Sequence, residues 1–176
     1  MNKRALLFRA RVSNPLNTNW QRRVLVSSGY IELGMLDDAT LALDEIAPAD
    51  QTRIEVLGAR LALYMAARKW RLAAALASHL VKVMPGNPSW WTQLAYAVRR
   101  SETIEKAEAI LLEARVIHPR NVIIMLNLAS YASVTGRTAE AKIRLRHAID
   151  LGEGVRRLAL DVEDLRPLWD WIGGLE

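Results

Sequence analysis

The sequence predicts an all-α solenoid of four stacked helix pairs, and three observations carry this prediction. Alanine recurs every 34 residues, apolar residues within each 34-residue unit follow helical spacing, and glycine, proline and capping residues lie between the expected helices. No segment shows the two-residue alternation of apolar and polar residues that marks a strand. With 176 residues, of which 51% are hydrophobic and 24% charged, the chain can bury a core unaided.

The repeat is clearest in one alanine column, formed by Ala39, Ala73, Ala107 and Ala141. Residues four and seven positions after each alanine are also apolar, which gives the second helix of each unit one buried stripe. Nine residues before each alanine, the first helix carries the column Tyr30, Tyr64, Val98 and Ala132. Sixteen residues before it, the column is Arg23, Leu57, Trp91 and Met125, so we expect Trp91 in the core.

These columns predict eight helices in four pairs. We expect them at residues 20–32, 36–47, 53–66, 70–82, 88–100, 104–117, 122–134 and 138–150, with a helix near 3–12 before them and one or two short helices after them. The predicted organisation is an N-terminal helix and cap at 1–19, repeats within 20–153 (20–53, 54–87, 88–121 and 122–155), and a C-terminal capping segment at 154–176.

The residues between the helices fit this division. Gly34 and Gly136 are placed to end a first helix in the left-handed conformation, and Pro85 and Pro119 each follow the end of a second helix. We expect side-chain N-caps at Asp37, Thr138 and Thr52, the last in a capping box with Glu55. Asn87, followed by Pro88, and Asn121 open the third and fourth units.

The repeat pattern resembles the tetratricopeptide repeat family over roughly residues 20–153. The third unit carries the resemblance in Trp91, Leu94, Ala95, Ala107, Leu111, Ala114 and Pro119, and the fourth in Leu128, Ala129, Gly136, Ala141, Leu145 and Ala148. The sequence departs from the family at Arg60, where leucine is usual, and at Gln51 and Glu153, where proline is usual. The resemblance implies a right-handed α-solenoid whose last apolar face is covered by capping helices.

The resemblance also implies a concave groove, lined by the first helix of each unit, that binds a peptide segment or a helix of a partner. The side chains offset from the core stripe are small and apolar in the first two units and polar or basic in the last two. The candidate groove residues are Gln21, Val24, Ser28, Met65, Thr92, Gln93, Tyr96, Arg99, Arg100, Asn127, Ser130 and Ser133. The Lys/Asn/Arg clamp with which chaperone cofactors of this family hold a terminal carboxylate is absent from the matching columns.

Arg99 and Arg100 are the most specific part of this groove. Two adjacent arginines at the end of a first helix, with Tyr96 one turn before them, form a donor-rich position. A planar guanidinium matches a carboxylate in shape and charge, so we predict that these arginines hold an acidic residue of the partner. The alternative is that both arginines are solvated at a helix end, where the helix dipole favours cations.

The composition argues against catalysis. There is no cysteine, no Gly-rich phosphate loop and no G-x-S-x-G motif, and the three histidines, His79, His118 and His147, lie outside any ligand motif. We therefore expect no enzyme activity, no catalytic or metal-binding residues and no cofactor. No apolar run is long enough to span a bilayer, so we expect a soluble, cytoplasmic protein that does not bind membranes.

The predicted function is a noncatalytic adaptor or scaffold that binds a protein or peptide partner in its groove, such as a partner with an acidic segment. A secretion-type chaperone holding a client protein and a nucleic-acid-associated repeat protein are the alternatives. The basic first 31 residues leave the nucleic-acid function open. The net charge of +5 disfavours this function, because such a charge is small for a nucleic-acid binder. The sequence leaves the oligomeric state open.

Overall fold

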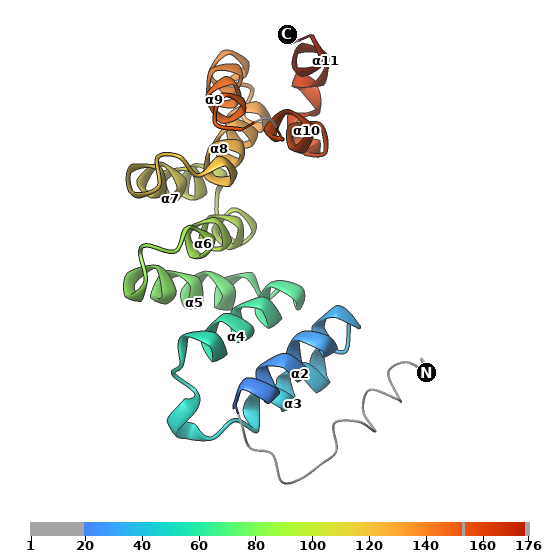
Figure 1. The fold of residues 1–176 in the computed structure, drawn as a ribbon, viewed down its shortest axis with the longest axis vertical. Helices are drawn as coiled ribbons and strands as arrows, with labels where there is room; N and C mark the ends of the chain where they lie inside the picture. The colour runs from blue at the N-terminus through green and yellow to red at the C-terminus, as the bar shows by residue number, and fades with distance from the viewer. Residues whose placement is uncertain (1–19, 153, 175–176) are drawn as a thin grey trace. The chain divides into compact units, whose positions relative to one another are not determined.

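The computed structural model describes residues 20–152 and 154–174, and every regular element in these ranges is a helix (Figure 1). The α-helices are α2 (Trp20–Glu32), α3 (Leu36–Asp44), α4 (Ile54–Ala66), α5 (Trp70–Val83), α6 (Pro88–Ser101), α7 (Ile104–Ile117), α8 (Val122–Val134), α9 (Thr138–Asp150), α10 (Val155–Leu160) and α11 (Trp169–Gly173). Two 3₁₀ helices, η1 (Pro48–Asp50) and η2 (Glu163–Leu168), complete the set. The helix expected near residues 3–12 lies outside the described residues.

The predicted helix bounds of the four pairs agree with the structure to within one residue, with one exception. Helix α3 ends at Asp44 and not at residue 47. Pro48 explains the difference, because proline disfavours a helical conformation in the residue before it, and Ala47 is extended with ψ 142°. The chain then forms the short helix η1 before α4 begins.

Asparagine and threonine side chains cap three helices at their N-termini. Asn87 and Asn121, which the sequence places at the openings of the third and fourth units, accept hydrogen bonds from the Ser89 amide at 3.0 Å and from the Ile124 amide at 3.0 Å. Thr103, which the sequence analysis did not single out, caps α7 by accepting from the Lys106 amide at 3.3 Å. These bonds satisfy amides that have no partner within their own helix.

The caps expected at Asp37, Thr52 and Thr138 are wrong. The N-cap positions of α3, α4 and α9 are Met35, Arg53 and Arg137, and none of them makes a side-chain capping bond. In α3 and α9 the reason is the turn that precedes each helix. The chain leaves a left-handed glycine and enters the next helix within two residues, so it has no extended position for a capping side chain.

Left-handed residues close three of the turns between paired helices. Gly34 has φ +72° and Gly136 has φ +76°, as predicted for helix C-caps. Arg68 lies one period after Gly34 and adopts φ 54°, a conformation that is costly for a residue with a Cβ. The turn geometry thus repeats even where the glycine does not.

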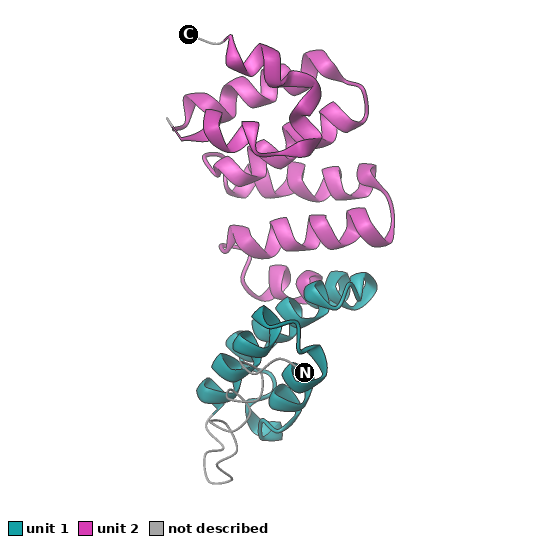
Figure 2. Cartoon of the chain, turned by 90° about the vertical axis from the view of Figure 1, so that its right-hand side faces the viewer, with its two compact units in different colours: residues 1–76 teal, residues 77–176 magenta. Residues whose placement is uncertain are grey.

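The described residues divide into two compact units, residues 20–76 in the first and residues 77–152 and 154–174 in the second, with the boundary inside α5 (Figure 2). In the first unit, α2, α3 and α4 contact one another around a core of aliphatic residues and one tyrosine. The core residues are Val26, Tyr30, Ala39, Ala42, Leu43, Ile46, Val56, Ala59 and Leu63. The division into four repeats at residues 20, 54, 88 and 122 stays a prediction.

Two departures from the family pattern, Arg60 and Gln51, contact each other in the first unit. The Arg60 Nη2 donates to Gln51 Oε1 at 2.9 Å and to Asp44 Oδ1 at 2.9 Å. The Gln51 amide nitrogen in turn donates to the carbonyl oxygens of Leu43 at 2.9 Å and Ile46 at 2.8 Å. Gln51 thus adds a side-chain donor to carbonyls at and just beyond the end of α3, where the regular helical hydrogen bonds stop.

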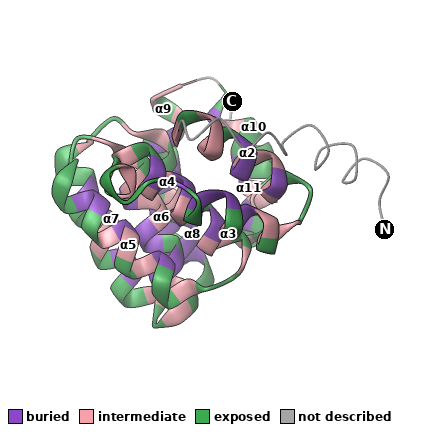
Figure 3. Ribbon diagram, turned by 90° about the horizontal axis from the view of Figure 1, so that it is seen from below, coloured by how far each residue is buried: buried purple, intermediate pink, exposed green. Residues whose placement is uncertain are grey.

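In the second unit, helices α6 to α9 form successive contacting pairs, and buried positions recur along the helices (Figure 3). Trp91 is buried, as predicted, and its indole nitrogen donates to the Pro85 carbonyl at 2.9 Å. The C-terminal helices α10, η2 and α11 pack on α8 and α9 through one apolar cluster. Its members are Leu126, Ala129, Ala132, Ala141, Leu145, Ala159, Leu165, Leu168 and Ile172.

A charged network lies inside the second unit. Glu108 of α7 is 8% exposed and accepts hydrogen bonds from Arg144 Nη1 at 2.6 Å and from Arg137 Nη2 at 2.6 Å. The Arg144 Nη1 also donates to the Leu128 carbonyl of α8 at 2.9 Å, and both arginines pair with Glu140. Burial raises the pKa of Glu108, but the hydrogen bonds from the two arginines outweigh burial and hold this pKa below its ordinary value.

Candidate protein-binding surface on helices α6 and α8

Helix α6 presents its polar side chains on the side away from its buried stripe. Trp91, Leu94, Ala95, Ala97 and Val98 are buried, whereas the candidate residues are half-buried or exposed. These candidates, which recur every three or four residues, are Thr92, Gln93, Tyr96, Arg99 and Arg100. Within the second unit α6 contacts α8, the next first helix, which carries the candidates Asn127, Ser130 and Ser133.

Arg99 already holds a carboxylate, and that carboxylate belongs to this chain. Its guanidinium donates two hydrogen bonds to Asp164 of η2, one from Nη2 to Oδ1 at 3.2 Å and a shorter one from Nη1 to Oδ2. The two side chains are 23% and 31% exposed. The hydrogen bond to Asp164 raises the pKa of Arg99 further above its ordinary value. The chemistry predicted for a partner is therefore present within the molecule.

Tyr131 of α8 completes the position of Arg99. The Arg99 guanidinium carbon lies 5.0 Å from the centroid of the Tyr131 ring, within the range of a cation–π interaction. Tyr131 is buried, and burial raises the pKa of its hydroxyl to about 12. The ring therefore stays neutral at physiological pH, and Asp164 supplies the anionic group of this site.

Arg100 differs from Arg99 in being exposed. Its Nη2 donates to the Tyr96 hydroxyl at 3.2 Å, and its guanidinium carbon lies 5.2 Å from the centroid of the Tyr96 ring. Tyr96 is itself 40% exposed. The pair places an aromatic ring and a cation side by side on the solvent side of α6.

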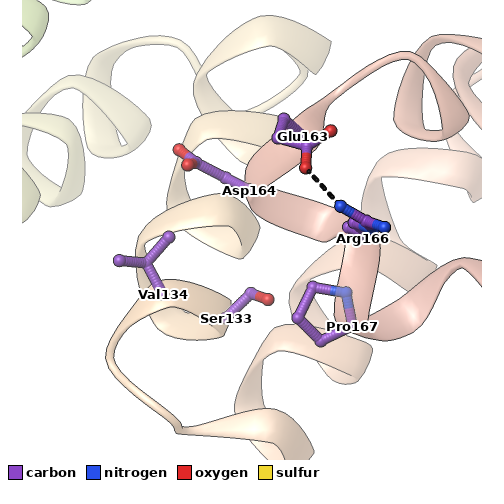
Figure 4. A pocket seen from close by; sticks show the side chains of 6 residues that line it. All are labelled: Ser133, Val134, Glu163, Asp164, Arg166 and Pro167. Atoms are coloured by element: carbon purple, nitrogen blue, oxygen red, sulfur yellow. Dashed lines mark hydrogen bonds and ion pairs between the residues drawn. The ribbon is translucent and has the colours of Figure 1, made fainter.

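The helix η2 borders this surface. An open pocket of about 550 Å³ lies between η2 and the end of α8. Figure 4 shows the side chains that line it, namely Ser133, Val134, Glu163, Asp164, Arg166 and Pro167. Glu163 and Arg166 pair across its rim at 3.2 Å, and both are largely exposed. Asp164 thus links the pocket to Arg99.

The prediction that Ser130 and Ser133 are groove residues needs correction, because both side chains are buried. Ser130 donates to the Leu126 carbonyl of its own helix at 3.0 Å, and Ser133 Oγ has no hydrogen-bond partner among the described residues. The physical reason is the position of α8, which contacts α6, α7, α9 and η2. These neighbours leave little of α8 accessible, so the polar side chains at Ser130 and Ser133 are buried, whereas Asn127 stays half-buried.

The other candidates of the second unit are partly accessible. Thr92, Gln93 and Asn127 are half-buried, and the Thr92 hydroxyl donates to the Ser89 carbonyl at 3.0 Å. The structure therefore brings together Gln93, Tyr96 and Arg100 on the solvent side of α6, and Arg99 with Asp164 beside α8.

The candidates of the first unit do not form a comparable polar group. Gln21 is exposed and Met65 is half-buried, whereas Val24 packs against the core of its own unit. The Ser28 hydroxyl donates to the Val24 carbonyl at 3.1 Å. In this unit an exposed leucine, Leu25, 73% accessible, is the more prominent feature of α2.

Asp164 and Tyr131 are the contributors that the sequence analysis missed. Asp164 reads from the sequence as an acid at the start of a helix, and it is 65 residues away from Arg99. Tyr131 occupies an apolar stripe and reads as core. The acidic character of the last 25 residues, with six carboxylate residues against three arginines, was the one signal that pointed to a cationic neighbour.

Comparison with solved structures identifies the fold. The chain has the fold of tetratricopeptide-repeat proteins: it is similar to TTC0263, a thermophilic protein of this class from Thermus thermophilus, with a TM-score of 0.65 and 18% identity over 88% of this chain and 84% of that one. It is also similar to YrrB, a protein of this class with an unusual peptide-binding site, with a TM-score of 0.62 and 11% identity over 94% and 90% of the two chains. MamA of strain AMB-1 gives a TM-score of 0.63 and 19% identity over 85% and 81%.

No protein-family model and no curated protein matches the chain. The described helices are the paired helices of a tetratricopeptide solenoid, a fold that typically serves protein–protein interaction and generally carries no catalytic site. In residues 20–152 and 154–174, no helix combines the length and the apolar character needed to cross a membrane.

Proposed function

We propose that this protein is a noncatalytic adaptor that binds a segment of a partner protein on the surface of α6 and α8. The observation that supports this most directly is the contact between Arg99 and Asp164, in which the surface already binds an acidic residue of a short helical segment. The peptide-binding site of YrrB, a protein with the same fold, supports a peptide or helix as the ligand class.

The accessible part of the surface is the group Gln93, Tyr96 and Arg100. Arg100 offers donors that a partner carboxylate accepts, and the exposed face of Tyr96 offers apolar area beside it. A charge-assisted hydrogen bond and an aromatic contact together favour a partner segment that carries an acidic residue next to an apolar one. The cytoplasmic location and the absence of catalysis are part of this proposal.

Nucleic acid is less well supported as the ligand. Seven of the described arginines pair with carboxylates: Arg23, Arg53, Arg60, Arg99, Arg137, Arg144 and Arg166. An arginine that is neutralised within the protein releases little counterion on binding phosphate. Seven of the sixteen arginines in the described residues are therefore committed to the chain's own acids, which reduces the charge available for phosphate contacts.

The test begins with capture of a partner from the native host by the full chain, followed by calorimetry with the captured protein's binding segment. The double variant Tyr96→Ala/Arg100→Ala should weaken this binding about tenfold or more, because it removes one charge-assisted hydrogen bond and one aromatic contact. Arg115→Ala is the matched control, since Arg115 is exposed on α7 and its loss removes the same charge elsewhere. An affinity that the double variant leaves unchanged, or one that falls steeply with salt in the manner of phosphate binding, would refute the proposal.

A further inference from the structure

The C-terminal segment, residues 155–174, is attached to the second unit in two chemically different ways. Its apolar attachment consists of Leu165, Leu168 and Ile172, which are at most 1% exposed in the cluster with α8 and α9. Its polar attachment is the double hydrogen bond of Asp164 with Arg99, above the ring of Tyr131. A cap that only covered apolar surface would need the first attachment and not the second.

The two attachments define a recognition pattern. Within η2, Asp164 faces Arg99, the leucines at the next position and at the fourth position after it are buried, and the residues between them, Arg166 and Pro167, are exposed. Because a 3₁₀ helix has three residues per turn, Leu165 and Leu168 lie on one face. The surface thus binds an acidic residue followed by leucines at positions +1 and +4.

The fit of the segment is incomplete in places that a different occupant could improve. Ser133 Oγ, below the pocket beside η2, and Trp169 Nε1, at the start of α11, are buried without hydrogen-bond partners among the described residues. Buried polar groups without partners weaken the docked state relative to one in which they are satisfied. The polar attachment is also partly exposed to solvent, so competing carboxylates can reach Arg99.

From these contacts we propose that the C-terminal segment occupies the partner surface of α6 and α8 in cis, and that the partner carries the same pattern: an acidic residue with leucine-type side chains at +1 and +4. This inference rests on the proposed adaptor function and adds to it the chemistry of the ligand and a means of control. A partner segment binds when it displaces the chain's own segment. The cis segment has the advantage of a high effective concentration, so only a well-matched partner competes.

The experiment uses the full chain and a fluorescein-labelled synthetic peptide of residues 155–174 as the probe, with binding followed by fluorescence anisotropy. The variant Asp164→Asn weakens the cis attachment and should bind the peptide about tenfold or more tightly than the wild type, the effect of losing a charge-assisted pair. Glu163→Gln is the matched control, because it removes a charge from the same segment without touching Arg99, and should behave as the wild type. A peptide that itself carries the Asp164→Asn change should not show this tighter binding to the Asp164→Asn variant.

Hydrogen–deuterium exchange of the same full-length variants provides an independent measurement. Residues 155–172 should exchange faster in Asp164→Asn than in the wild type, whereas Glu163→Gln should leave their exchange unchanged, with circular dichroism confirming that both variants are folded. Slow exchange in Asp164→Asn, together with no peptide binding, would overturn the inference and make the segment a permanent cap.

The other outcomes distinguish a failure of the cis competition from a failure of the proposed adaptor function. Equal affinity of the wild type and Asp164→Asn for the peptide would overturn the cis competition and leave the adaptor function standing. Dimers of the wild type that the peptide dissociates, detected by light scattering, would assign the surface to a second copy of the chain and overturn the partner assignment. The adaptor function itself fails if the Tyr96→Ala/Arg100→Ala variant binds the captured partner as the wild type does, or if the affinity falls steeply with salt in the manner of phosphate binding.

Discussion

Replacing Glu108 by alanine should destabilise the protein by about 3 kcal/mol, and the structure shows where this loss arises. The change removes three charge-assisted hydrogen bonds, two from Arg137 and one from Arg144. The two arginines contribute unequally. Arg137 is 39% exposed and recovers water on losing its partner, whereas Arg144 is 10% exposed and recovers little.

The magnitude follows from the buried arginine. Breaking a buried ion pair by removing one partner costs about 3–5 kcal/mol, because the remaining charge stays desolvated. Arg144 keeps its hydrogen bond to the Leu128 carbonyl and its contact with Glu140, so the lower end of that range applies. Glu108→Gln, which keeps one acceptor oxygen, should lose less, about 1–2 kcal/mol.

Urea unfolding followed by circular dichroism measures this difference as a shift of the transition midpoint at constant slope. Glu113→Ala is the control, because Glu113 lies on the same helix and is exposed. If Glu108→Ala lowered the free energy of unfolding by less than about 1 kcal/mol, or no more than Glu113→Ala, the network would contribute little and the argument from burial would be refuted.

The stabilising effect of Glu108 can be measured as the difference in free energy of unfolding between wild type and Glu108→Gln. This difference should be fully present above the unfolded pKa of about 4.3 and be lost as the pH falls through the lower folded pKa. A difference that grew on acidification would contradict this prediction. Arg68→Gly should raise the free energy of unfolding by about 0.5–1 kcal/mol and the melting temperature with it, because glycine adopts φ 54° without the cost borne by arginine; an unchanged or lower melting temperature would count against this. Truncation after Leu151 removes three fully buried side chains worth about 1.5–3 kcal/mol each and exposes the apolar cluster on α8 and α9, so thermal unfolding and light scattering should show lower stability and aggregation; a monomer with unchanged melting would make the segment a tether.

The helices could be predicted from the sequence because their signals are local and repeat. The apolar stripe around Trp91 is repeated in each unit, and Gly34 and Gly136 mark turns at the same phase of the period. Caps were harder to predict, because a side chain can cap a helix only where the preceding turn places its residue at the N-cap position in a suitable backbone conformation. Thr138 has the right chemistry for a cap and the wrong place, because the turn at Gly136 leads directly into α9.

The departures from the family pattern show a second limit. Arg60 and Gln51 each look like a defect when considered alone, one a charged residue at an apolar position and the other a missing proline. The structure joins them, because Gln51 binds the carbonyls at the end of α3 and Arg60 binds Gln51. Two changes that compensate each other across nine residues of sequence leave no trace in a column-by-column comparison. The residue types at these two positions depend on a contact between their side chains, and a periodic pattern of single positions does not record such contacts.

The proposed binding surface on α6 and α8 also depends on a contact between residues far apart in the sequence, namely Arg99 and Asp164. The chemistry of Arg99 was predictable, because an arginine beside a tyrosine at a helix end suits a carboxylate wherever the carboxylate comes from. Its partner was not, because Asp164 reaches Arg99 only after the chain has turned through α10 and brought η2 against α8. The sequence therefore indicated the kind of ligand but could not show that the chain supplies one itself. In the cis competition that we propose, the affinity of the surface for the chain's own segment, to which the contact of Arg99 with Asp164 contributes, sets the affinity that a partner must exceed.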